Sequence, residues 1–277
     1  MTHMREIQNK VKNADAILIA AGNGLSISEG YHLFADNLAF RELFSDFCTK
    51  YGIRCIIQGM TYPYKTEEET WAFWSRLITR YVHSYTPTRQ MKELKKIVGE
   101  KPYFIITSNA ETHFEIAGFD SKKIYEIEGT LIEMQCAKAC HKTIYPVTEM
   151  IKKMAAAEKD GRVPSELVPR CPVCGGPMQL RYGFSPSFIQ DEDASERYMT
   201  FIDQYYNQKL VILELGIGAG NRLIKEPLMK LAASGRDITY ITINKGEVYI
   251  ADNIKDKSFG LDGDLTDILA ELSSAQS

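Results

Sequence analysis

The sequence has no long apolar run and no excess of basic charge. No stretch reaches the roughly 18 apolar residues that a membrane-spanning helix needs, and residues 1–13 are polar and charged, without the apolar segment of a secretory signal. We therefore expect a cytoplasmic protein that does not enter a membrane. The 36 Asp and Glu residues outnumber the 33 Lys and Arg residues. Nucleic acid is not an expected partner, because its binding relies on basic surfaces that neutralise phosphates.

Internal repeats and low-complexity tracts are also absent. Of the 277 residues, 44% are hydrophobic, which is ample for a buried core. We therefore predict that residues 1–277 form a single domain, and that segments departing from its main pattern are insertions.

Five short apolar runs recur along the chain, and most of them end at Gly, Asn or Ser. They lie at residues 15–21, 103–107, 123–127, 210–215 and 238–243. Continuous apolar runs of this length are typical of strands buried on both faces of a parallel sheet. Segments of helical periodicity, such as residues 89–98 and 223–233, lie between most of them. This alternation predicts an α/β fold with a Rossmann-like, doubly wound parallel sheet.

Two stretches interrupt this alternation and predict a smaller lobe. Residues 34–85 are aromatic-rich and helical in pattern, and residues 130–181 carry most of the cysteines. We interpret the first as a helical insertion and the second as a metal-binding module. The large Rossmann-like lobe is then built from residues 1–33, 86–129 and 182–277.

Four of the six cysteines occur in two close pairs about thirty residues apart. The four are Cys136, Cys140, Cys171 and Cys174, and two glycines follow the second pair. Four thiolates at this spacing predict a closed, structural Zn²⁺ site of the zinc-ribbon type, because a catalytic zinc keeps one position open. The alternatives are four unpaired thiols and a competing ligand at His141. Cys48 and Cys55 stand apart, and we assign them to core packing.

Glycine-rich turns follow two of the predicted strands. One is the stretch from Gly22 to Ser26, which also contains Asn23 and Gly24; the other is Gly216-Ile217-Gly218. Small residues let backbone N–H groups approach a pyrophosphate, and the start of the following helix favours its charge. Both turns are therefore candidate phosphate sites. The alternative is an ordinary strand-to-helix turn without a ligand.

Polar residues lie at the ends of three other predicted strands or directly after them. They are the stretch Thr107-Ser108-Asn109-Ala110-Glu111, the carboxylate Glu128 and the amide Asn244. Open parallel sheets bind their ligands at the carboxyl ends of their strands, so these residues are candidates for a binding site. The alternatives are a helix capped by Ser108 or Asn109, a solvated Glu128 and a plain turn at Asn244.

The order and spacing of these pieces resemble the sirtuin family over residues 14–269. That family has a GAGxSxxSGIPDFR stretch, a TQNxD stretch, a catalytic His-Gly pair, paired cysteines, a Gly-Thr/Ser-Ser turn, an asparagine after a strand and a GDxD-like end. In this chain, besides the four cysteines, the corresponding residues are 22–35, 107–111, 128–129, 216–218, 244 and 263–265.

The resemblance implies that NAD is a co-substrate and assigns roles to the matching residues. Pyrophosphate is expected near the first glycine turn, the adenine-side ribose near Asn244 and the nicotinamide end near Asn109 and Glu111. The implied NAD-binding residues are Gly22, Asn23, Gly24, Ser26, Ser108, Gly216, Gly218, Asn244, Asp264 and Leu265. The implied catalytic residues are Asn109, Glu111 and Glu128.

Departures from the family pattern gather where deacylation takes place. His32, Leu33 and Ala35 replace Pro, Asp and Arg, and Ser108 and Glu111 replace Gln and Asp. Glu128 stands at the catalytic histidine. A carboxylate with an ordinary pKa of about 4.3 is a weak base near neutral pH, but it stabilises the positive charge that develops on a ribose during glycosyl transfer. This favours release of nicotinamide and transfer of ADP-ribose to an acceptor.

The pattern resembles the macrodomain-linked, class M branch of sirtuins, which carries glutamine at the position of Glu128. That branch implies a lipoyl-carrying, glycine-cleavage H-like protein as acceptor and a macrodomain partner that reverses the modification. We therefore predict an NAD-dependent protein ADP-ribosyltransferase. One alternative is a lysine deacylase or NAD glycohydrolase. Another is a non-catalytic NAD or ADP-ribose sensor, which the loss of polar side chains at Leu33 and Ala35 favours.

Overall fold

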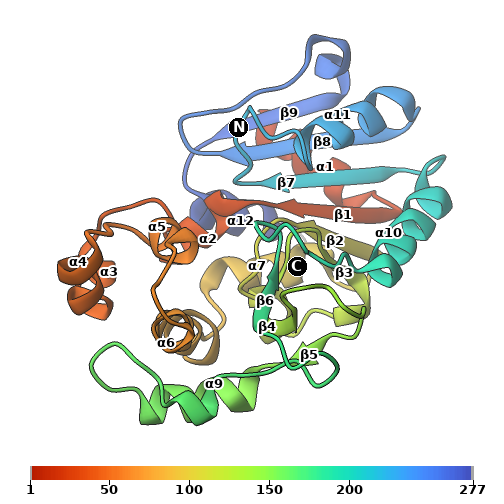
Figure 1. Ribbon diagram of the computed structural model, residues 1–277. Coiled ribbons are helices and arrows are strands. Elements are labelled where there is room, and N and C mark those ends of the chain that lie inside the picture. The colour runs from red at the N-terminus through yellow and green to blue at the C-terminus, as the bar shows by residue number, and fades with distance from the viewer. Residues whose placement is uncertain (1, 276–277) are drawn as a thin grey trace.

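The computed structural model describes residues 2–275 and contains two sheets (Figure 1). The larger sheet has six parallel strands in the order β3-β2-β1-β7-β8-β9. Its strands are β1 (Ala16–Ala21), β2 (Tyr103–Thr107), β3 (Ile124–Glu126), β7 (Leu210–Leu215), β8 (Ile238–Asn244) and β9 (Ser258–Asp262). The predicted Rossmann-like α/β fold is confirmed, with β9 as an additional edge strand.

Both faces of this sheet are covered by helices. Alternate side chains of each strand point to opposite faces, so each strand packs against helices on both sides. Ile17 and Ile19 of β1 pack toward one group of helices, and Leu18 packs toward the other. The first group is α1 (Thr2–Lys12), α7 (Arg89–Val98) and α12 (Leu265–Ser273), and the second is α10 (Glu192–Tyr205), α11 (Lys225–Ser234) and η4 (Asp252–Lys257). Burial on both faces explains why the strands are continuous apolar runs.

The smaller lobe has its own core, built from the helical insertion and the cysteine module. Its helices are α3 (Leu38–Leu43), α4 (Ser45–Tyr51), α5 (Ile56–Thr61), α6 (Glu67–Ile78), η1 (Thr79–His83), α9 (Thr148–Ala157) and η3 (Ser165–Leu167). An antiparallel sheet in the order β5-β4-β6 completes it, with β4 (Gly129–Cys136), β5 (Tyr145–Pro146) and β6 (Met178–Tyr182). Figure 1 shows α3 to α6 and α9 grouped away from the parallel sheet.

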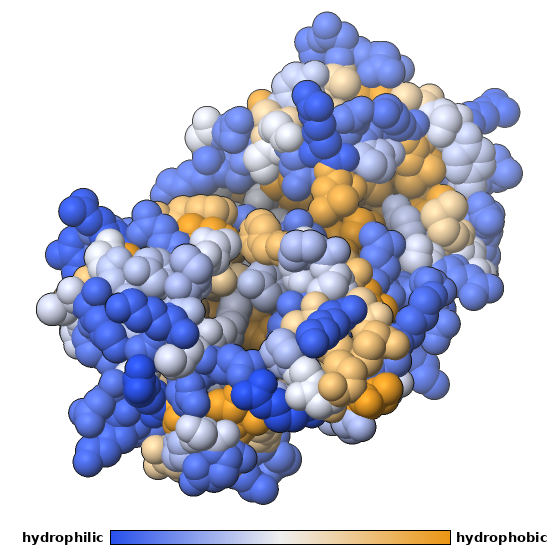
Figure 2. Space-filling view, viewed as in Figure 1, coloured by the Kyte–Doolittle hydropathy of each residue, from blue (hydrophilic) through white to orange (hydrophobic). Residues whose placement is uncertain are grey.

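The molecular surface carries only separate hydrophobic patches on the face shown in Figure 2, among mostly hydrophilic residues. None of the helices within residues 2–275 combines the length and the apolar character needed to cross a membrane.

The order of the strands reverses between β1 and β7, which are neighbours in the centre of the sheet. From β1 the chain continues outward to β2 and β3, and from β7 it continues in the opposite direction to β8 and β9. At such a reversal the connections leave toward opposite sides and open a crevice at the carboxyl ends of the strands. The first residues beyond these two ends are Gly22 and Gly216. The topology thus places both glycine turns at the crevice.

A buried ion pair ties α11 to the sheet. Glu214 of β7 and Lys225 of α11 are almost fully buried, and the Lys225 Nζ lies 2.5 Å from a carboxylate oxygen of Glu214. The hydroxyls of Thr242, at 2.7 Å, and Tyr240 also donate to this carboxylate. Because every polar atom of the cluster faces a partner, the burial of two charges is compensated.

We expect Lys225→Met to destabilise the fold by about 3–5 kcal/mol, because the buried Glu214 carboxylate then keeps no cationic partner. The free energy of unfolding from urea titrations measures this loss. Lys230→Met is the matched control: its ammonium pairs with Glu226 on the exposed face of the same helix, at 2.7 Å, so its loss should cost no more than about 0.5 kcal/mol. Equal stability of the two variants would contradict the assignment.

Candidate active site

The two glycine turns are in direct contact at the crevice. The Gly24 N–H donates to the carbonyl oxygen of Gly216 at 2.8 Å. A Cβ on Gly24 would lie 2.5 Å from the Cα of Gly216, and Gly216 itself has a φ of +62°. Neither position accepts a side chain without moving the backbone. The Gly24 amide is used within the protein, so its contribution to a ligand site is the space that a side chain would fill.

A pocket between the two lobes collects most of the polar candidates from the strand ends. Asn23 comes from α2 (Asn23–Ser28), and Ser108, Asn109, Glu111 and Glu128 come from the segments that follow β2 and β3. The opposite wall is mostly apolar and aromatic, and it consists of Tyr31, Leu33, Phe34, Ile57, Met60, Ala110, Leu131, Tyr182, Gly183 and Phe184. A polar corner facing an apolar wall suits a ligand with one charged and one aromatic part.

Among the described residues that line this pocket, Asn109 carries the one fully buried side-chain polar atom without a hydrogen-bond partner. Its side-chain Nδ2 donates to the carbonyl oxygen of Gly22 at 3.0 Å, which fixes the amide plane. Its Oδ1 is buried and has no hydrogen-bond partner. A buried acceptor without a partner is costly, so its presence in a pocket points to a ligand that donates to it. The helix-cap alternative is wrong, since α8 (His113–Ile116) begins later and its N-cap residue, Thr112, makes no side-chain cap.

Glu111 lies behind this amide as part of a buried polar network. The Ser26 hydroxyl donates to Glu111 Oε1, and His113 Nδ1 lies 3.9 Å from the same oxygen. Burial raises the pKa of Glu111 above the ordinary glutamate value, and the charge of His113 and the Ser26 hydrogen bond act in the opposite direction. Ser26 therefore orients Glu111, and its hydroxyl is engaged within the protein.

Glu128 is half-buried at the junction between the lobes. Its position is set by the backbone: its carbonyl oxygen accepts from Gly183 N at 2.7 Å. The next residue, Gly129, has a φ of +81°, and a Cβ there would collide with the carbonyl oxygen of Arg181. Burial raises the pKa of the Glu128 carboxyl, and no charged partner among residues 2–275 offsets this effect. The carboxyl can therefore hold a proton at a higher pH than a solvated glutamate does.

The remaining candidates lie at the other side of the strand reversal, at the ends of β7, β8 and β9. Asn244 Nδ2 donates to the carbonyl oxygen of Glu247 at 2.8 Å, and Asp264 caps α12 by accepting from Thr266 N at 2.8 Å. Leu265 is buried in the core under α12, and Gly218 is exposed. They do not line the pocket of Glu128. A separate cavity of about 720 Å³ lies beside α11, between Arg222 and Tyr249.

Two groups of site residues were not identified from the sequence. One group is the part of the apolar wall that lies outside the motif stretches, and no local signal marks its members: Ile57, Met60, Leu131, Tyr182, Gly183 and Phe184. The other group is His113 with Glu29, which lie next to motif residues. The short separation of His113 from Glu111 in the sequence could have marked His113 as a site residue. Its role, however, depends on Glu29, whose Oε2 lies 2.8 Å from His113 Nδ1 in the fold.

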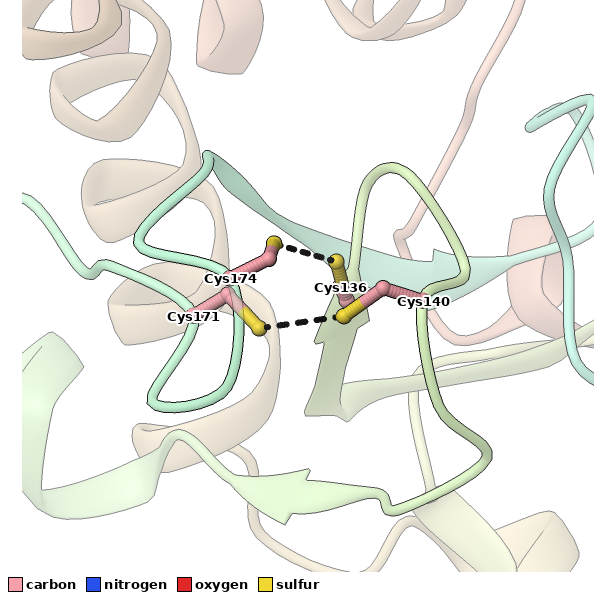
Figure 3. Close-up of side chains that lie close together, drawn as sticks. All are labelled: Cys136, Cys140, Cys171 and Cys174. Carbon is pink, nitrogen blue, oxygen red and sulfur yellow. Dashed lines mark hydrogen bonds between the residues drawn. The ribbon is translucent and has the colours of Figure 1, made fainter.

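The four cysteines form a cluster that fits a structural zinc site. Their sulfur atoms lie within 4.8 Å of one another, and Figure 3 shows them facing a common centre. The Cys136–Cys174 and Cys140–Cys171 sulfur pairs are 3.7 and 3.6 Å apart. A tetrahedral zinc with Zn–S bonds of about 2.3 Å requires sulfur atoms about 3.8 Å apart, so the donor set fits the ion. His141 Nδ1 lies beside it, 3.1 Å from Cys140 Sγ, and Cys55 is buried elsewhere.

We expect Cys136→Ser to lose the zinc and to loosen the smaller lobe, because Cys136 and Cys171 belong to that lobe's core. Both tryptophans of the chain, Trp71 and Trp74, are buried in the same core, so their fluorescence should shift to the red. Zinc content and tryptophan emission measure this. Cys48→Ser lies outside the cluster and should change neither. Retention of zinc in Cys136→Ser would contradict the assignment.

The chain was compared with family models, with solved structures and with the sequences of known proteins. No family model matches the chain. A solved structure of a Sir2 homologue in complex with NAD has a TM-score of 0.66 at 16% identity, over 98% of this chain and 93% of that one. The fold is therefore that of the sirtuins.

Two relatives extend the comparison to sequence. A Staphylococcus aureus protein described as a protein ADP-ribosyltransferase is 31% identical over 268 residues, which cover 95% of this chain and 84% of the relative. The chain belongs to the sirtuin family, in the group that contains this protein. A Fusarium oxysporum protein described as a probable bifunctional ADP-ribose hydrolase/ADP-ribosyltransferase is 27% identical over 75% of this chain, which spans about a third (36%) of it.

Proposed function

We propose that the chain is an NAD-dependent protein ADP-ribosyltransferase, which releases nicotinamide and joins ADP-ribose to a protein acceptor. The observation that carries the proposal is the pocket in which the unsatisfied Asn109 Oδ1 and the Glu128 carboxyl lie together. When bound, NAD supplies a positively charged nicotinamide that leaves the ribose. Membership of the group that contains the Staphylococcus protein supports this reading.

Asn109 and Glu111 hold the nicotinamide end in this proposal. The carboxamide of nicotinamide offers N–H donors, which the unpaired Asn109 Oδ1 accepts. Glu111 adds a carboxylate behind it, oriented by Ser26. Because both side chains are held by hydrogen bonds to the protein, they need little reorganisation on binding.

Glu128 acts on the ribose. Its carboxylate stabilises positive charge at the reacting carbon while the nicotinamide bond breaks, and it accepts the proton that the attacking acceptor group gives up. Burial raises its pKa, which strengthens it as a base relative to a solvated glutamate. This role needs no histidine.

The remaining contacts with NAD follow the strand ends. We propose that the pyrophosphate lies at the contact between the two glycine turns, where the missing side chains of Gly22, Gly24, Gly216 and Gly218 leave space. Asn23 and Ser108 line the nicotinamide side, Ser26 acts through Glu111, and Asn244, Asp264 and Leu265 border the adenine side. Asn244 must then exchange its present hydrogen bond to Glu247 for one to the ribose.

We propose a lipoyl-carrying, glycine-cleavage H-like protein as the acceptor and a macrodomain protein as the partner that removes ADP-ribose. The Fusarium relative supports the second part, because its description joins an ADP-ribose hydrolase to a transferase in one chain. Transfer from NAD labelled with ³²P in its adenylate phosphate tests the activity. Label on the acceptor is the expected product; free ADP-ribose only, O-acyl-ADP-ribose, or tight binding without turnover would identify a glycohydrolase, a deacylase or a sensor instead.

We expect Asn109→Ala to reduce nicotinamide release by at least about 10²-fold while the fold stays intact, because the pocket loses the acceptor that positions the leaving group. Release is measured by chromatography, and circular dichroism checks the fold. Asn207→Ala changes an exposed asparagine and serves as the matched control. Wild-type turnover in a folded Asn109→Ala protein would refute the role of this residue.

We expect nicotinamide release to fall as the pH drops through the raised pKa of Glu128, because the carboxylate is the active form and burial favours the protonated one. The acid limb of the kcat profile should therefore lie above the ordinary value of about 4.3. Glu128→Gln should lower kcat by about 10²-fold with little change in KM for NAD. Glu128→Asp keeps a carboxylate and should retain part of the rate. Full activity of Glu128→Gln would remove Glu128 from the mechanism.

A further inference from the structure

Both ring nitrogens of His113 face hydrogen-bond acceptors. Its Nε2 lies 2.8 Å from the carbonyl oxygen of Tyr81, in the π-helical turn η1, and its Nδ1 lies 2.8 Å from Glu29 Oε2, just after α2. A carbonyl oxygen only accepts, so Nε2 must carry a proton. An ionised carboxylate also only accepts, so Nδ1 must carry one as well.

Glu29 has the surroundings of an ionised carboxylate. Its other oxygen, Oε1, accepts from the hydroxyl of Tyr85 at 2.7 Å and from that of Thr88 at 2.5 Å. Two hydroxyl donors on Oε1 stabilise the negative form of this carboxylate before any proton is assigned to His113. His113 is therefore an imidazolium. The Tyr85 ring stacks on it in parallel, with the centroids 3.6 Å apart, and the electron-rich ring face favours a cation there.

The imidazolium lies next to the pocket carboxyl Glu111. Nδ1 of His113 is 3.9 Å from Glu111 Oε1, and both side chains are almost fully buried. An opposite charge at such a distance in a dry environment acts strongly on a carboxyl group. The Glu29 and Glu111 carboxyl groups thus approach the same ring nitrogen of His113, and Glu111 lines the pocket.

We propose that His113 is a positioning residue that keeps Glu111 ionised and directed at the nicotinamide end of the pocket. The proposal rests on the proposed function, because it assigns Glu111 its charge during that reaction. Without His113, the buried Glu111 carboxyl would lose an adjacent positive charge, and its pKa would rise further above the ordinary glutamate value. Burial alone already raises the pKa of Glu111, and His113 is the strongest influence that lowers it.

The other groups around the pair do not supply a replacement charge. Glu29 and Tyr85 contact His113. Burial lowers the pKa of His113, but the hydrogen bond to Glu29 and the charge of Glu111 outweigh it, so the pKa is raised. The Tyr31 phenol and the Glu126 carboxyl also lie close enough to Glu111 to feel its charge, and neither group can be a cation. No lysine or arginine within residues 2–275 pairs with Glu29 or Glu111 in a salt bridge. The cation next to Glu111 is therefore His113.

The charge on His113 is tested by ¹⁵N NMR of the zinc-loaded protein labelled at histidine. The chain has five histidines, so the His113 signals are assigned by their loss in His113→Gln. We expect both nitrogens to show the imidazolium signature at pH 7, above the ordinary histidine pKa of about 6.5. A signal with one bare nitrogen at pH 7 would overturn the proposal.

A second variant keeps this test independent of the folding of His113→Gln. Glu29→Gln retains an acceptor oxygen for Nδ1 but removes the negative charge. The proposal expects the imidazolium signature to be lost at a lower pH than in the wild type. An unchanged titration in Glu29→Gln would contradict the proposal.

The effect on Glu111 is measured by the pH profile of nicotinamide release. The comparison is made in a Glu128→Gln background, so that one pocket carboxyl titrates instead of two. Adding His113→Gln should move the acid limb up by about one pH unit or more, since Glu111 loses an adjacent opposite charge. His3→Gln, at an exposed histidine, is the control and should leave the limb in place.

The possible outcomes separate the two proposals. An acid limb that does not move, with His113→Gln folded, overturns the role of His113 while leaving the proposed transfer reaction in place. Undiminished release in Asn109→Ala overturns the proposed site instead, and the NMR result on His113 would stand by itself.

Discussion

The contact between Gly24 and Gly216 is the constraint on which the site depends. It brings the turns after β1 and β7 to within a hydrogen bond of each other, at the point where the strand order reverses. Side chains at either position would force the two strand ends apart. Because β2 and β8 pair directly with β1 and β7, this contact also sets how far apart the ends of β2 and β8 lie on the two sides of the crevice.

The two lobes contribute different chemistry to the same pocket. The parallel sheet supplies the polar and acidic groups at its strand ends, and the smaller lobe supplies an apolar wall. Glu128 stands at the junction, held by the close approach of Gly129 to Arg181. The cysteine cluster lies at the far end of the same module, where Cys136 ends β4 and Cys174 precedes β6. An acidic corner in a partly dry pocket favours a cationic group, and the nicotinamide of NAD is one.

The sequence was sufficient to predict the layers of the fold, and it identified the candidate polar residues at the strand ends. Doubly buried strands and four spaced cysteines produce strong local patterns, so the sheet and the zinc module were predictable. The edge strand β9 was missed, because its run is short and interrupted by Gly260. The apolar pocket wall and the contact between His113 and Glu29 could not be predicted, since they join segments more than eighty residues apart. The hydrogen bonds made by Gly24 N and Ser26 Oγ could not be predicted from the sequence either.

We propose that the crevice at the strand reversal binds NAD with its ribose beside Glu128. A crystal structure of the chain with ADP-ribose tests this most directly. We expect diphosphate density at the contact of Gly24 with Gly216, and ribose density facing Glu128 and Asn109. Density in the cavity between Arg222 and Tyr249 instead, or a ribose turned away from Glu128, would contradict it.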